Sequence, residues 1–186
     1  AEDGETLNTV NPATGEVITT LPRSKAFDVN AATQAALKAG PAWSATTMEE
    51  RIRWLDTIAQ ALEDDAETVA RLESTDTGKP IGLARNVDAA RSVANFRFFA
   101  AQGRQHTEPT FADHGAVNHV HRSPVGCVGL ITPWNLPLYL LTWKVAPALL
   151  MGNTIVAKPS ELTPMTANHL ANVMPVSYTH LTLPTI

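Results

Sequence analysis

Residues 125–161 read VGCVGLITPWNLPLYLLTWKVAPALLMGNTIVAKPSE, and this stretch is the most informative one about the fold class. Its two short apolar runs, Val125–Ile131 and Thr154–Ala157, lack polar alternation, which is typical of parallel strands that are covered on both faces. The mostly apolar segment Leu138–Met151 between them has a length that suits a helix, with Pro147 as the expected site of a kink. The stretch therefore predicts a right-handed strand–helix–strand unit of an α/β fold.

A polar segment follows each predicted strand at its carboxyl end. The segment TPWN occupies residues 132–135, and the segment KPSE occupies residues 158–161. Open α/β sheets bind ligands in the crevice beyond the carboxyl ends of their strands. We therefore expect a ligand to bind at these two loops.

Several motifs of this stretch resemble those of the aldehyde dehydrogenase superfamily. They are PWNLP, WKVAPAL, GNT and AKPSELTP, and the resemblance extends upstream nearly to residue 8. Motifs in fixed order are a more specific signal than a lone glycine fingerprint. The segments RSVANFRFFA and NLPLYLLTWK further resemble 2-aminomuconate and 2-hydroxymuconate semialdehyde dehydrogenases. The resemblance implies the truncated N-terminal part of an α/β aldehyde dehydrogenase fold, with a helical segment, an oligomerisation hairpin and the start of a Rossmann-like parallel sheet.

Composition narrows the classes of partner. The chain has 186 residues, of which 44% are hydrophobic, so it can bury a core. A net charge of −4 argues against a nucleic-acid surface or a polybasic membrane anchor, and no apolar run reaches the roughly 18 residues of a spanning helix. The single cysteine, Cys127, suits a reducing compartment. We therefore expect a cytoplasmic protein without nucleic-acid or membrane partners.

Pattern and resemblance together divide the chain into four segments. Residues 1–103 are expected to form the N-terminal hairpin and helices of the cofactor-binding domain, and residues 104–124 a β-hairpin that pairs subunits. Residues 125–174 are expected to hold the first βαβ unit of the NAD-binding sheet. Residues 175–186 have two prolines and no charges, and they are similar to translated sequencing adapter. We predict that they are a non-native tail, with a divergent natural terminus as the alternative.

Helical spacing predicts several helices before residue 104. Asp28 is expected to cap the first, and Thr47 with Glu50 should form a capping box before the second. A later helix should run from Pro80 to Gly103. Its predicted buried stripe consists of Leu83, Val87, Ala90, Ala94 and Phe98.

The predicted hairpin is rich in histidine. His119 and His121 fall on one side of a strand, with His106 and His114 nearby. These histidines suggest either a metal site or a solvent-facing strand, and we favour the strand and predict no metal, because no carboxylate or thiol ligand accompanies them. A two-stranded ribbon is marginal alone in water, so it should need a partner. The resemblance implies a homodimer or homotetramer.

The resemblance also implies a mechanism. In this family a cysteine thiolate attacks the aldehyde carbonyl, hydride passes to a nicotinamide, and a glutamate activates the water that hydrolyses the thioester. Both residues lie far beyond residue 186 in full-length members. Cys127 falls inside the first predicted strand, where it is expected to be a small core side chain rather than the nucleophile. This chain alone should therefore be inactive.

Two residues match catalytic positions of the family. Asn135 matches the asparagine of PWN, whose amide donates to the developing oxyanion, although an asparagine after a strand is otherwise an ordinary turn residue. Lys144, within WKVAPA, is implied to lie near the catalytic channel and to organise polar groups or relay protons. Its alternative role is an amine that reaches past the helix to solvent.

The cofactor residues are also implied by the resemblance. Lys158 and Glu161 match the pair that holds the adenosine ribose, although such a pair alone is usually a solvated surface pair. A carboxylate accepts both ribose hydroxyls and repels a 2′-phosphate, so NAD is favoured over NADP. The other residues expected to contact the cofactor are Ile131, Thr132, Pro133, Trp134 and Ser160.

Arg91 is the expected substrate-binding residue. It matches an arginine that faces the substrate channel in muconic semialdehyde dehydrogenases, whose substrates carry a carboxylate remote from the aldehyde. A guanidinium could hold that carboxylate with two parallel hydrogen bonds. The alternative is a boundary arginine that pairs with Asp88, and Arg97 is the second candidate for the substrate role.

Two functions follow. In the first, the chain is a fragment of an NAD-dependent aldehyde dehydrogenase that oxidises a muconic-type semialdehyde to the carboxylic acid through a cysteine thioester. In the second, it is a noncatalytic truncated module for binding or subunit association. Because of the truncation, we also expect that the helices covering one face of the short sheet are missing.

Overall fold

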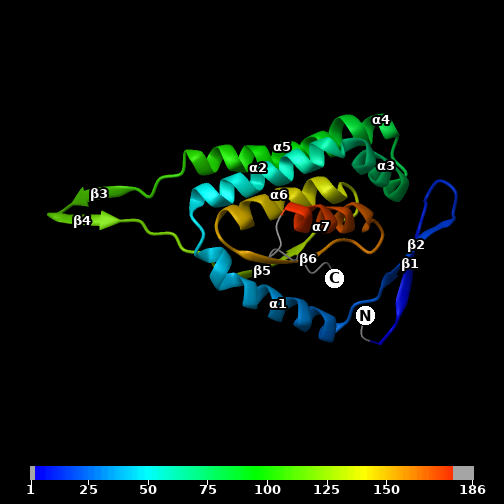
Figure 1. Ribbon diagram of the computed structural model, residues 1–186, viewed down its shortest axis with the longest axis horizontal. Coiled ribbons are helices and arrows are strands. Elements are labelled where there is room, and N and C mark those ends of the chain that lie inside the picture. The colour runs from blue at the N-terminus through cyan, green and yellow to red at the C-terminus, as the bar shows by residue number, and fades with distance from the viewer. Residues whose placement is uncertain (1–2, 178–186) are drawn as a thin grey trace.

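The computed structural model describes residues 3–177 of the chain. A body of helices lies over a short parallel sheet, and a hairpin projects at each end of the molecule (Figure 1). In chain order, the elements are β1 (Thr6–Val10), β2 (Val17–Pro22), α1 (Ala26–Ser44), α2 (Met48–Asp64), α3 (Ala66–Thr77), α4 (Ile81–Leu83), η1 (Ala84–Ala89), α5 (Ala90–Arg104), β3 (Thr110–Asp113), β4 (Ala116–His119), β5 (Cys127–Ile131), α6 (Pro137–Leu150), β6 (Thr154–Lys158) and α7 (Met165–Ser177).

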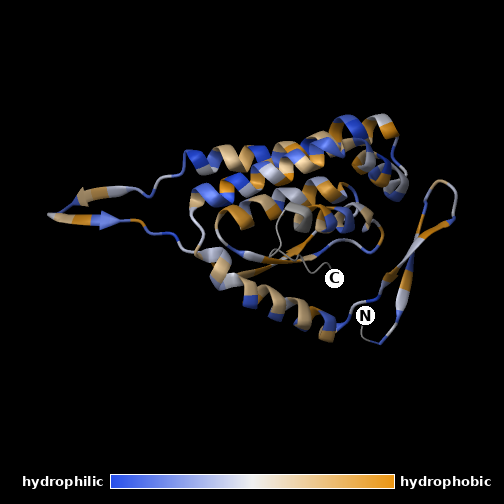
Figure 2. Ribbon diagram, viewed as in Figure 1, coloured by the Kyte–Doolittle hydropathy of each residue, from blue (hydrophilic) through white to orange (hydrophobic). Residues whose placement is uncertain are grey.

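β5 and β6 form the parallel pair that the sequence predicts. Their register runs from Cys127 opposite Thr154 to Ile131 opposite Lys158. α6 connects the two strands and continues through Pro147 to its last turn. Both strands consist largely of hydrophobic residues (Figure 2), and β6 is buried except at its last residue. The predicted strand–helix–strand unit is therefore confirmed.

Both faces of this sheet are covered. α6 lies on one face and α1 on the other (Figure 1). The small side chains of Ala32 and Ala36 on α1 pack against Val156 of β6 and against Cys127 of β5. The expectation of an uncovered face is therefore wrong. Periodicity predicted the helix but could not reveal its packing partners, because β5 and β6 begin about 80 and 110 residues after the end of α1.

α2 and α5 lie side by side above α6 and form the main core with it (Figure 1). The predicted capping box at the start of α2 is confirmed: Thr47 Oγ1 accepts from the Glu50 amide at 3.2 Å, and the Glu50 carboxylate accepts from the Thr47 amide at 2.7 Å. The cap satisfies amides that the first helical turn leaves without partners. Fully buried side chains of this core are Leu55, Ile58, Leu62, Phe96, Leu138, Leu141 and Leu149.

The helix predicted over residues 80–103 is divided, and its buried stripe is wrong. A single turn, α4, leads into the π-helix η1 and then into α5. Leu83 and Phe98 of the predicted stripe are each 48% exposed. The true buried face mixes small and apolar residues with three polar ones, Asp88, Ser92 and Asn95. Ser92 Oγ donates to the Asp88 carbonyl at 2.7 Å, and the Asn95 amide donates to Thr142 Oγ1 of α6 at 2.9 Å. The buried positions of η1 and α5 are Ala84, Asp88, Ala89, Ser92, Val93, Asn95, Phe96, Ala100 and Gly103.

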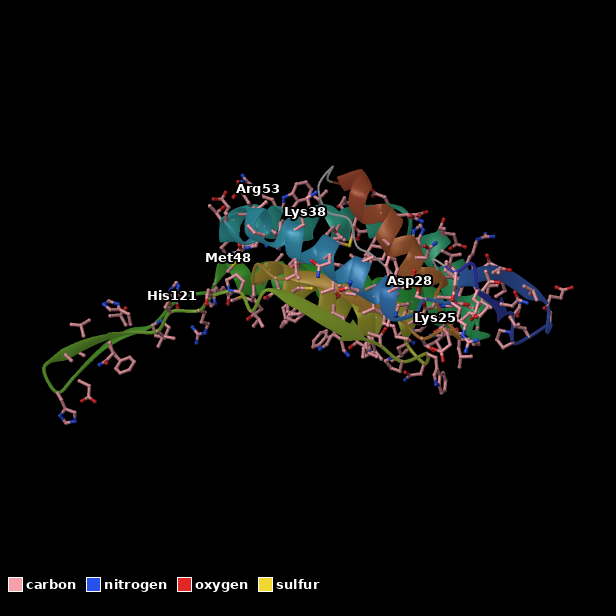
Figure 3. The ribbon with its side chains drawn as sticks, turned by 90° about the horizontal axis from the view of Figure 1, so that it is seen from below. Lys25, Asp28, Lys38, Met48, Arg53 and His121 are labelled. Atoms are coloured by element: carbon pink, nitrogen blue, oxygen red, sulfur yellow. The ribbon has the colours of Figure 1, made fainter. Side chains whose placement is uncertain are left out.

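Two predicted helix ends are displaced by a few residues. Lys25 is the N-cap of α1, and Asp28 lies in the first turn, where its carboxylate accepts from the Lys25 amide at 2.9 Å (Figure 3). Gly103 lies inside α5, which continues for one more residue. A Cβ at Gly103 would lie 2.8 Å from Leu150 Cδ1 and 3.0 Å from Ile52 Cγ1. This glycine therefore allows close packing and does not end the helix.

The predicted hairpin within residues 104–124 is confirmed. β3 and β4 pair antiparallel and extend away from the helical body (Figures 1 and 3). His114 and Gly115 both have positive φ, 47° and 80°, as the tight turn of a twisted ribbon requires. Phe111 and Val117 on the strands are exposed to solvent. The ribbon therefore projects without a covering element among residues 3–177.

The hairpin histidines face solvent, as the favoured interpretation predicts. The His119 ring lies 3.1 Å from Thr110 Oγ1, and the His121 ring lies 3.2 Å from the Glu108 carboxylate at the base of the hairpin. No group of three or more histidine, cysteine or acidic side chains is placed to hold a metal ion within the described part of the chain.

α7 is the last described element. It ends at Ser177, three residues into the segment that we predict to be non-native, and the rest of that segment lies outside the described residues. Across the range 3–177, no helix has both the length and the apolar character that crossing a membrane requires.

Candidate active-site loops

The TPWN and KPSE loops lie together at the carboxyl end of the sheet. The Thr132 amide donates to the Lys158 carbonyl at 3.2 Å, which extends the strand pairing by one hydrogen bond. The Thr163 hydroxyl donates to the Trp134 carbonyl at 3.4 Å and joins the loops a second time. The expected meeting of the two polar loops is therefore found.

Asn135 lies in the bend between β5 and α6, and it is exposed. Its backbone carbonyl accepts a hydrogen bond at 3.4 Å from the ammonium of Lys79, which lies just after α3. Pro137 opens α6 two residues later, where its missing N–H removes no helical bond. Asn135 is thus exposed on a backbone that Lys79 anchors.

Lys144 reaches the same loop from α6. Its ammonium donates to the carbonyl of Ile131, the last residue of β5. The contact brings the lysine to the carboxyl end of the strand instead of directing it only to solvent. Lys144 therefore belongs structurally to the edge that carries Asn135.

The four residues predicted to line the cofactor channel differ in exposure. Ile131, Pro133 and Trp134 are exposed at the edge of the sheet. Thr132 is buried, and its hydroxyl has no hydrogen-bond partner among the described residues. An unpartnered buried hydroxyl usually signals a missing partner such as water or a ligand.

The KPSE loop presents an ion pair beside a cavity. Lys158 Nζ lies 2.9 Å from Glu161 Oε2, and this lysine lowers the pKa of the Glu161 carboxyl below its ordinary value. Glu161 is therefore ionised at neutral pH and can accept hydrogen bonds from hydroxyl groups. Ser160 is buried, and its hydroxyl accepts from the Leu162 amide at 3.2 Å.

The adjoining cavity has a volume of about 810 Å³, within the range of ligand-binding clefts. Lys158, Ser160 and Glu161 line one side. Leu7 and Leu21 of the β1–β2 hairpin and Val29 near the start of α1 also line the cavity. Apolar side chains and an ionised carboxylate in one cavity suit a ligand with a flat ring on a polyhydroxyl group, so these residues fit the adenosine part of a dinucleotide.

Arg91 lies near the start of α6. Its guanidinium carbon is 5.2 Å from the centre of the Tyr139 ring, a cation–π distance, and Tyr139 follows Asn135 by about one helical turn. The alternative pairing of Arg91 with Asp88 is wrong, because Asp88 is buried and lies 3.0 Å from Lys79 Nζ. Arg91 is exposed, and its guanidinium lies against the first turn of α6.

Arg97 is engaged elsewhere. Its guanidinium forms a two-pronged ion pair with Glu63 of α2, with one donor–acceptor distance of 3.0 Å. Beside Tyr139, an aromatic cluster joins α5 to α6: Phe98 stacks on Trp143 with ring centres 6.1 Å apart. Arg91 thus lies next to Tyr139 of this aromatic cluster, whereas Arg97 of α5 forms an ion pair with α2.

Cys127 lies at the opposite end of the sheet from the loops. It begins β5, four residues before Ile131, so the strand separates the two by about 13 Å. It is partly buried and packs against the alanines of α1. This position supports the prediction that Cys127 is a structural side chain.

Sequence patterns missed a buried charged cluster behind the Asn135 loop. Glu73 and Asp88 are fully buried on either side of Lys79, and Asp76 is buried one turn beyond Glu73. Burial raises the pKa of the Glu73 carboxyl to about 7 and that of Asp76 to about 6. Asp76 accepts from the Met165 amide at 2.9 Å and so caps α7. The motif ESTDTGKP, with two acids three residues apart before a Gly-Lys-Pro turn, was the available signal.

Comparison with known proteins identifies the family. The model of the aldehyde dehydrogenase family matches residues 1–177. The chain belongs to the aldehyde dehydrogenase family. This aldehyde dehydrogenase chain is 49% identical over 170 residues to 2-aminomuconic semialdehyde dehydrogenase of Homo sapiens, a match that covers 90% of the chain and 35% of the relative. It is 42% identical over 178 residues to 2-hydroxymuconic semialdehyde dehydrogenase of Pseudomonas sp. strain CF600, covering 92% and 36%.

A solved structure agrees with this assignment. PnpE in complex with nicotinamide adenine dinucleotide matches with a TM-score of 0.90 at 41% identity, over 94% of this chain and 36% of that chain. The chain therefore spans about a third of the length of its relatives. The predicted resemblance to muconic semialdehyde dehydrogenases and the predicted truncated α/β fold are both confirmed.

Proposed function

We propose that this chain is the N-terminal part of an NAD-dependent aldehyde dehydrogenase that oxidises a muconic-type semialdehyde to its carboxylic acid through a cysteine thioester. The nucleophilic cysteine and the general base belong to the remainder of the protein. The observation that carries the proposal is the joining of the TPWN and KPSE loops at one edge of the sheet. The muconic semialdehyde relatives support the substrate class.

NAD is the cofactor that the loop chemistry favours. Lys158, Ser160 and Glu161 would hold its adenosine end, and the Ile131–Trp134 segment would line the path toward the reacting end. The ionised carboxylate of Glu161 accepts hydroxyl donors and repels a 2′-phosphate, which favours NAD over NADP. When bound, the nicotinamide accepts hydride from the substrate. The NAD complex of PnpE, a protein of similar fold, supports this choice.

Asn135 stabilises the reacting carbonyl group, and Lys144 supports the strand end beside it. The Asn135 side-chain amide donates a hydrogen bond to the oxyanion that forms when the thiolate attacks the aldehyde. A preorganised donor of this kind is worth roughly 3–4 kcal/mol in a dry site. Lys144 holds the end of β5 through its bond to Ile131 and places a positive charge at the same edge.

Arg91 binds the substrate carboxylate that lies remote from the aldehyde. Its guanidinium is exposed near the first turn of α6, and the Tyr139 ring orients it. Two parallel N–H donors match a carboxylate and would fix the distance between the anchored end of the substrate and the reacting carbonyl.

Subunit pairing is a second role for the chain. The exposed ribbon of β3 and β4 carries Phe111 and Val117, and a two-stranded ribbon gains stability by pairing with another chain. We propose that it joins copies of a cytoplasmic homodimer or homotetramer. A noncatalytic association module is the alternative function, and this ribbon is the observation that favours it.

Catalysis by the full-length protein decides between these functions. Purified full-length protein is mixed with 2-hydroxymuconic semialdehyde and either NAD or NADP, and formation of the reduced cofactor is followed by absorbance. Reduction of NAD in preference to NADP, with formation of the dicarboxylic acid, is the expected result. Absence of turnover with any aldehyde, together with intact oligomerisation, would instead establish the association module.

A further inference from the structure

Lys79 is a buried lysine held in a fixed place. Its side chain is 11% exposed, and it follows Gly78, whose left-handed φ of 74° ends α3. The Ser74 hydroxyl donates to the Lys79 carbonyl at 2.7 Å and fixes the backbone at the turn. A lysine that gives up most of its hydration needs partners for its charge and its donors.

The ammonium of Lys79 has three such partners. Glu73 Oε1 lies at 3.4 Å, Asp88 Oδ2 at 3.0 Å and the Asn135 carbonyl oxygen at 3.4 Å. The Glu73 carboxylate and the Asn135 carbonyl accept hydrogen bonds from the ammonium, and Asp88 forms an ion pair with it. Glu73 and Asp88 are fully buried, and Asn135 belongs to the loop that carries the proposed oxyanion donor.

The loop is anchored at successive backbone positions. Lys144 binds the Ile131 carbonyl, the Thr132 amide binds the carbonyl of Lys158, and the Thr163 hydroxyl binds the Trp134 carbonyl. Lys79 holds the last position, the peptide of Asn135 itself. The direction of the Asn135 side chain depends on the orientation of that peptide.

We propose that Lys79 is a positioning residue for the oxyanion donor. It holds the Asn135 carbonyl and so fixes the side-chain amide in the orientation that meets the oxyanion. Glu73 and Asp88 fix the lysine in turn. This inference rests on the proposed function of Asn135. The partners of the Lys79 ammonium are Glu73, Asp88 and the Asn135 carbonyl, so we expect Lys79 to act on the reaction through Asn135.

A double-mutant cycle in the full-length enzyme tests the inference. Lys79→Met removes the donors and keeps the length of the side chain, and Asn135→Ala removes the oxyanion donor. The readout is the rate of cysteine acylation by 4-nitrophenyl acetate, an activated ester whose attack forms the same oxyanion and needs no nicotinamide. The Kd for NAD is measured alongside, and it should stay within about twofold of wild type in both variants.

The expected result is strongly non-additive. Asn135→Ala lowers the acylation rate roughly 10²–10³-fold. Lys79→Met lowers it about 10- to 50-fold in the wild-type background and less than about threefold in the Asn135→Ala background, as expected for residues that act as one unit. Equal losses in both backgrounds would overturn the positioning role and leave Lys79 as a structural counter-ion. No loss from Asn135→Ala alone would refute the proposed role of Asn135, and with it this inference.

Charge balance requires a second pair of variants. Lys79→Met leaves two buried carboxylates without their cation and can prevent folding. The double substitution Lys79→Met with Asp88→Asn removes one charge of each sign, and the same cycle with Asn135→Ala is then run in that background. Non-additivity there supports the inference, and additivity overturns it. The matched control is Lys38→Met on the exposed side of α1, which should change the rate less than about twofold (Figure 3).

Discussion

Glu161 and Glu73 both lie beside a lysine, yet their carboxyl groups have opposite pKa shifts. At Glu161 the neighbouring Lys158 dominates and lowers the pKa, because the pair lies at the surface. At Glu73 burial dominates and raises the pKa to about 7, although Lys79 acts in the opposite direction. The first glutamate is therefore a fixed anion suited to accept ribose hydroxyls, and the second titrates near neutral pH.

The role of Glu161 can be tested through cofactor affinity. In the full-length enzyme, Glu161→Gln should weaken NAD about tenfold, which corresponds to the loss of a charged hydrogen bond, and should narrow the preference for NAD over NADP. Fluorescence titration with both cofactors measures the change. Glu49→Gln is the matched control, since Glu49 forms an exposed pair with Arg53 at 3.7 Å on α2. Unchanged NAD affinity in Glu161→Gln would argue against the ribose role.

Arg91 should affect one class of substrate. Arg91→Ala in the full-length enzyme should raise KM for a carboxylate-bearing semialdehyde by a factor on the order of ten to several hundred, because a charged hydrogen bond to the remote carboxylate is lost. A simple uncharged aldehyde should be much less affected. Arg97→Ala is the control, since Arg97 is paired with Glu63. Equal losses on both substrates would mean that Arg91 has a structural role.

At the scale of elements, the segment from α3 to α5 shows where sequence patterns fail. Local periodicity correctly predicted a helical segment here, but it assumed that apolar residues mark the buried face. Asp88, Ser92 and Asn95 are buried because each finds a partner; the Asn95 amide, for example, donates to the Tyr139 carbonyl at 3.0 Å. In addition, η1 is a π-helix, with hydrogen bonds between residues five apart, so the residues that share one face of α5 do not continue the α-helical spacing counted from Pro80.

Buried acids on α3 should make stability depend on pH. The pKa of Glu73 rises from its ordinary 4.5 to about 7 on folding, so the folded state holds the proton more tightly. Stability contributed by this group is therefore present below pH 4.5 and is lost as the pH rises through 7, by on the order of 3 kcal/mol. Glu73→Gln should raise the thermal midpoint of the full-length protein relative to wild type at pH 8 and change it little at pH 5.

Glu67 provides the control for this pH effect. It is exposed on the same helix, and a hydrogen bond from Arg85 lowers its pKa. Stability from this group is present above its ordinary pKa and is lost only at lower pH. Glu67→Gln should therefore produce the same small change at pH 5 and at pH 8. A pH-independent effect of Glu73→Gln would contradict the assignment of Glu73 as a group that titrates near neutral pH.

The β3–β4 ribbon should control assembly. Replacing Phe111 and Val117 by serine removes its exposed apolar side chains and should lower the molar mass of the full-length protein in solution, as measured by light scattering after size exclusion. Leu37→Ser, at an exposed apolar position of α1, is the control and should leave the mass unchanged. If the ribbon variant keeps the wild-type mass, subunits pair through another surface.

At the scale of the whole molecule, contacts between neighbouring segments were predictable and distant contacts were not. The motifs PWN and KPSE lie at the ends of two paired strands, so their meeting follows from the βαβ pattern alone. The packing of α1 on β6 and the bond from Lys79 to Asn135 join residues far apart in the chain. Hydrophobic periodicity in the sequence does not indicate which polar residues, such as Lys79 and Asn135, will bond to each other.

The isolated chain should show no catalysis. Its one thiol, Cys127, lies at the end of β5 opposite the loops, and the chain spans about a third of its relatives. Purified residues 1–186, given NAD and an aldehyde, should therefore produce no reduced cofactor. Turnover by this chain that survives Cys127→Ala would contradict the thioester mechanism itself.

The covering of the sheet by α1 has a consequence for biosynthesis. α1 leaves the ribosome about 110 residues before the β6 strand on which its alanines pack. Because synthesis proceeds at roughly 5–20 residues per second, α1 is without its packing partner for on the order of 5–20 s. The part of α1 that later packs on β6 presents Ala32 and Ala36, which expose little apolar surface to other chains or to chaperones in the meantime. Small side chains therefore suit a helix that is made early and packs late.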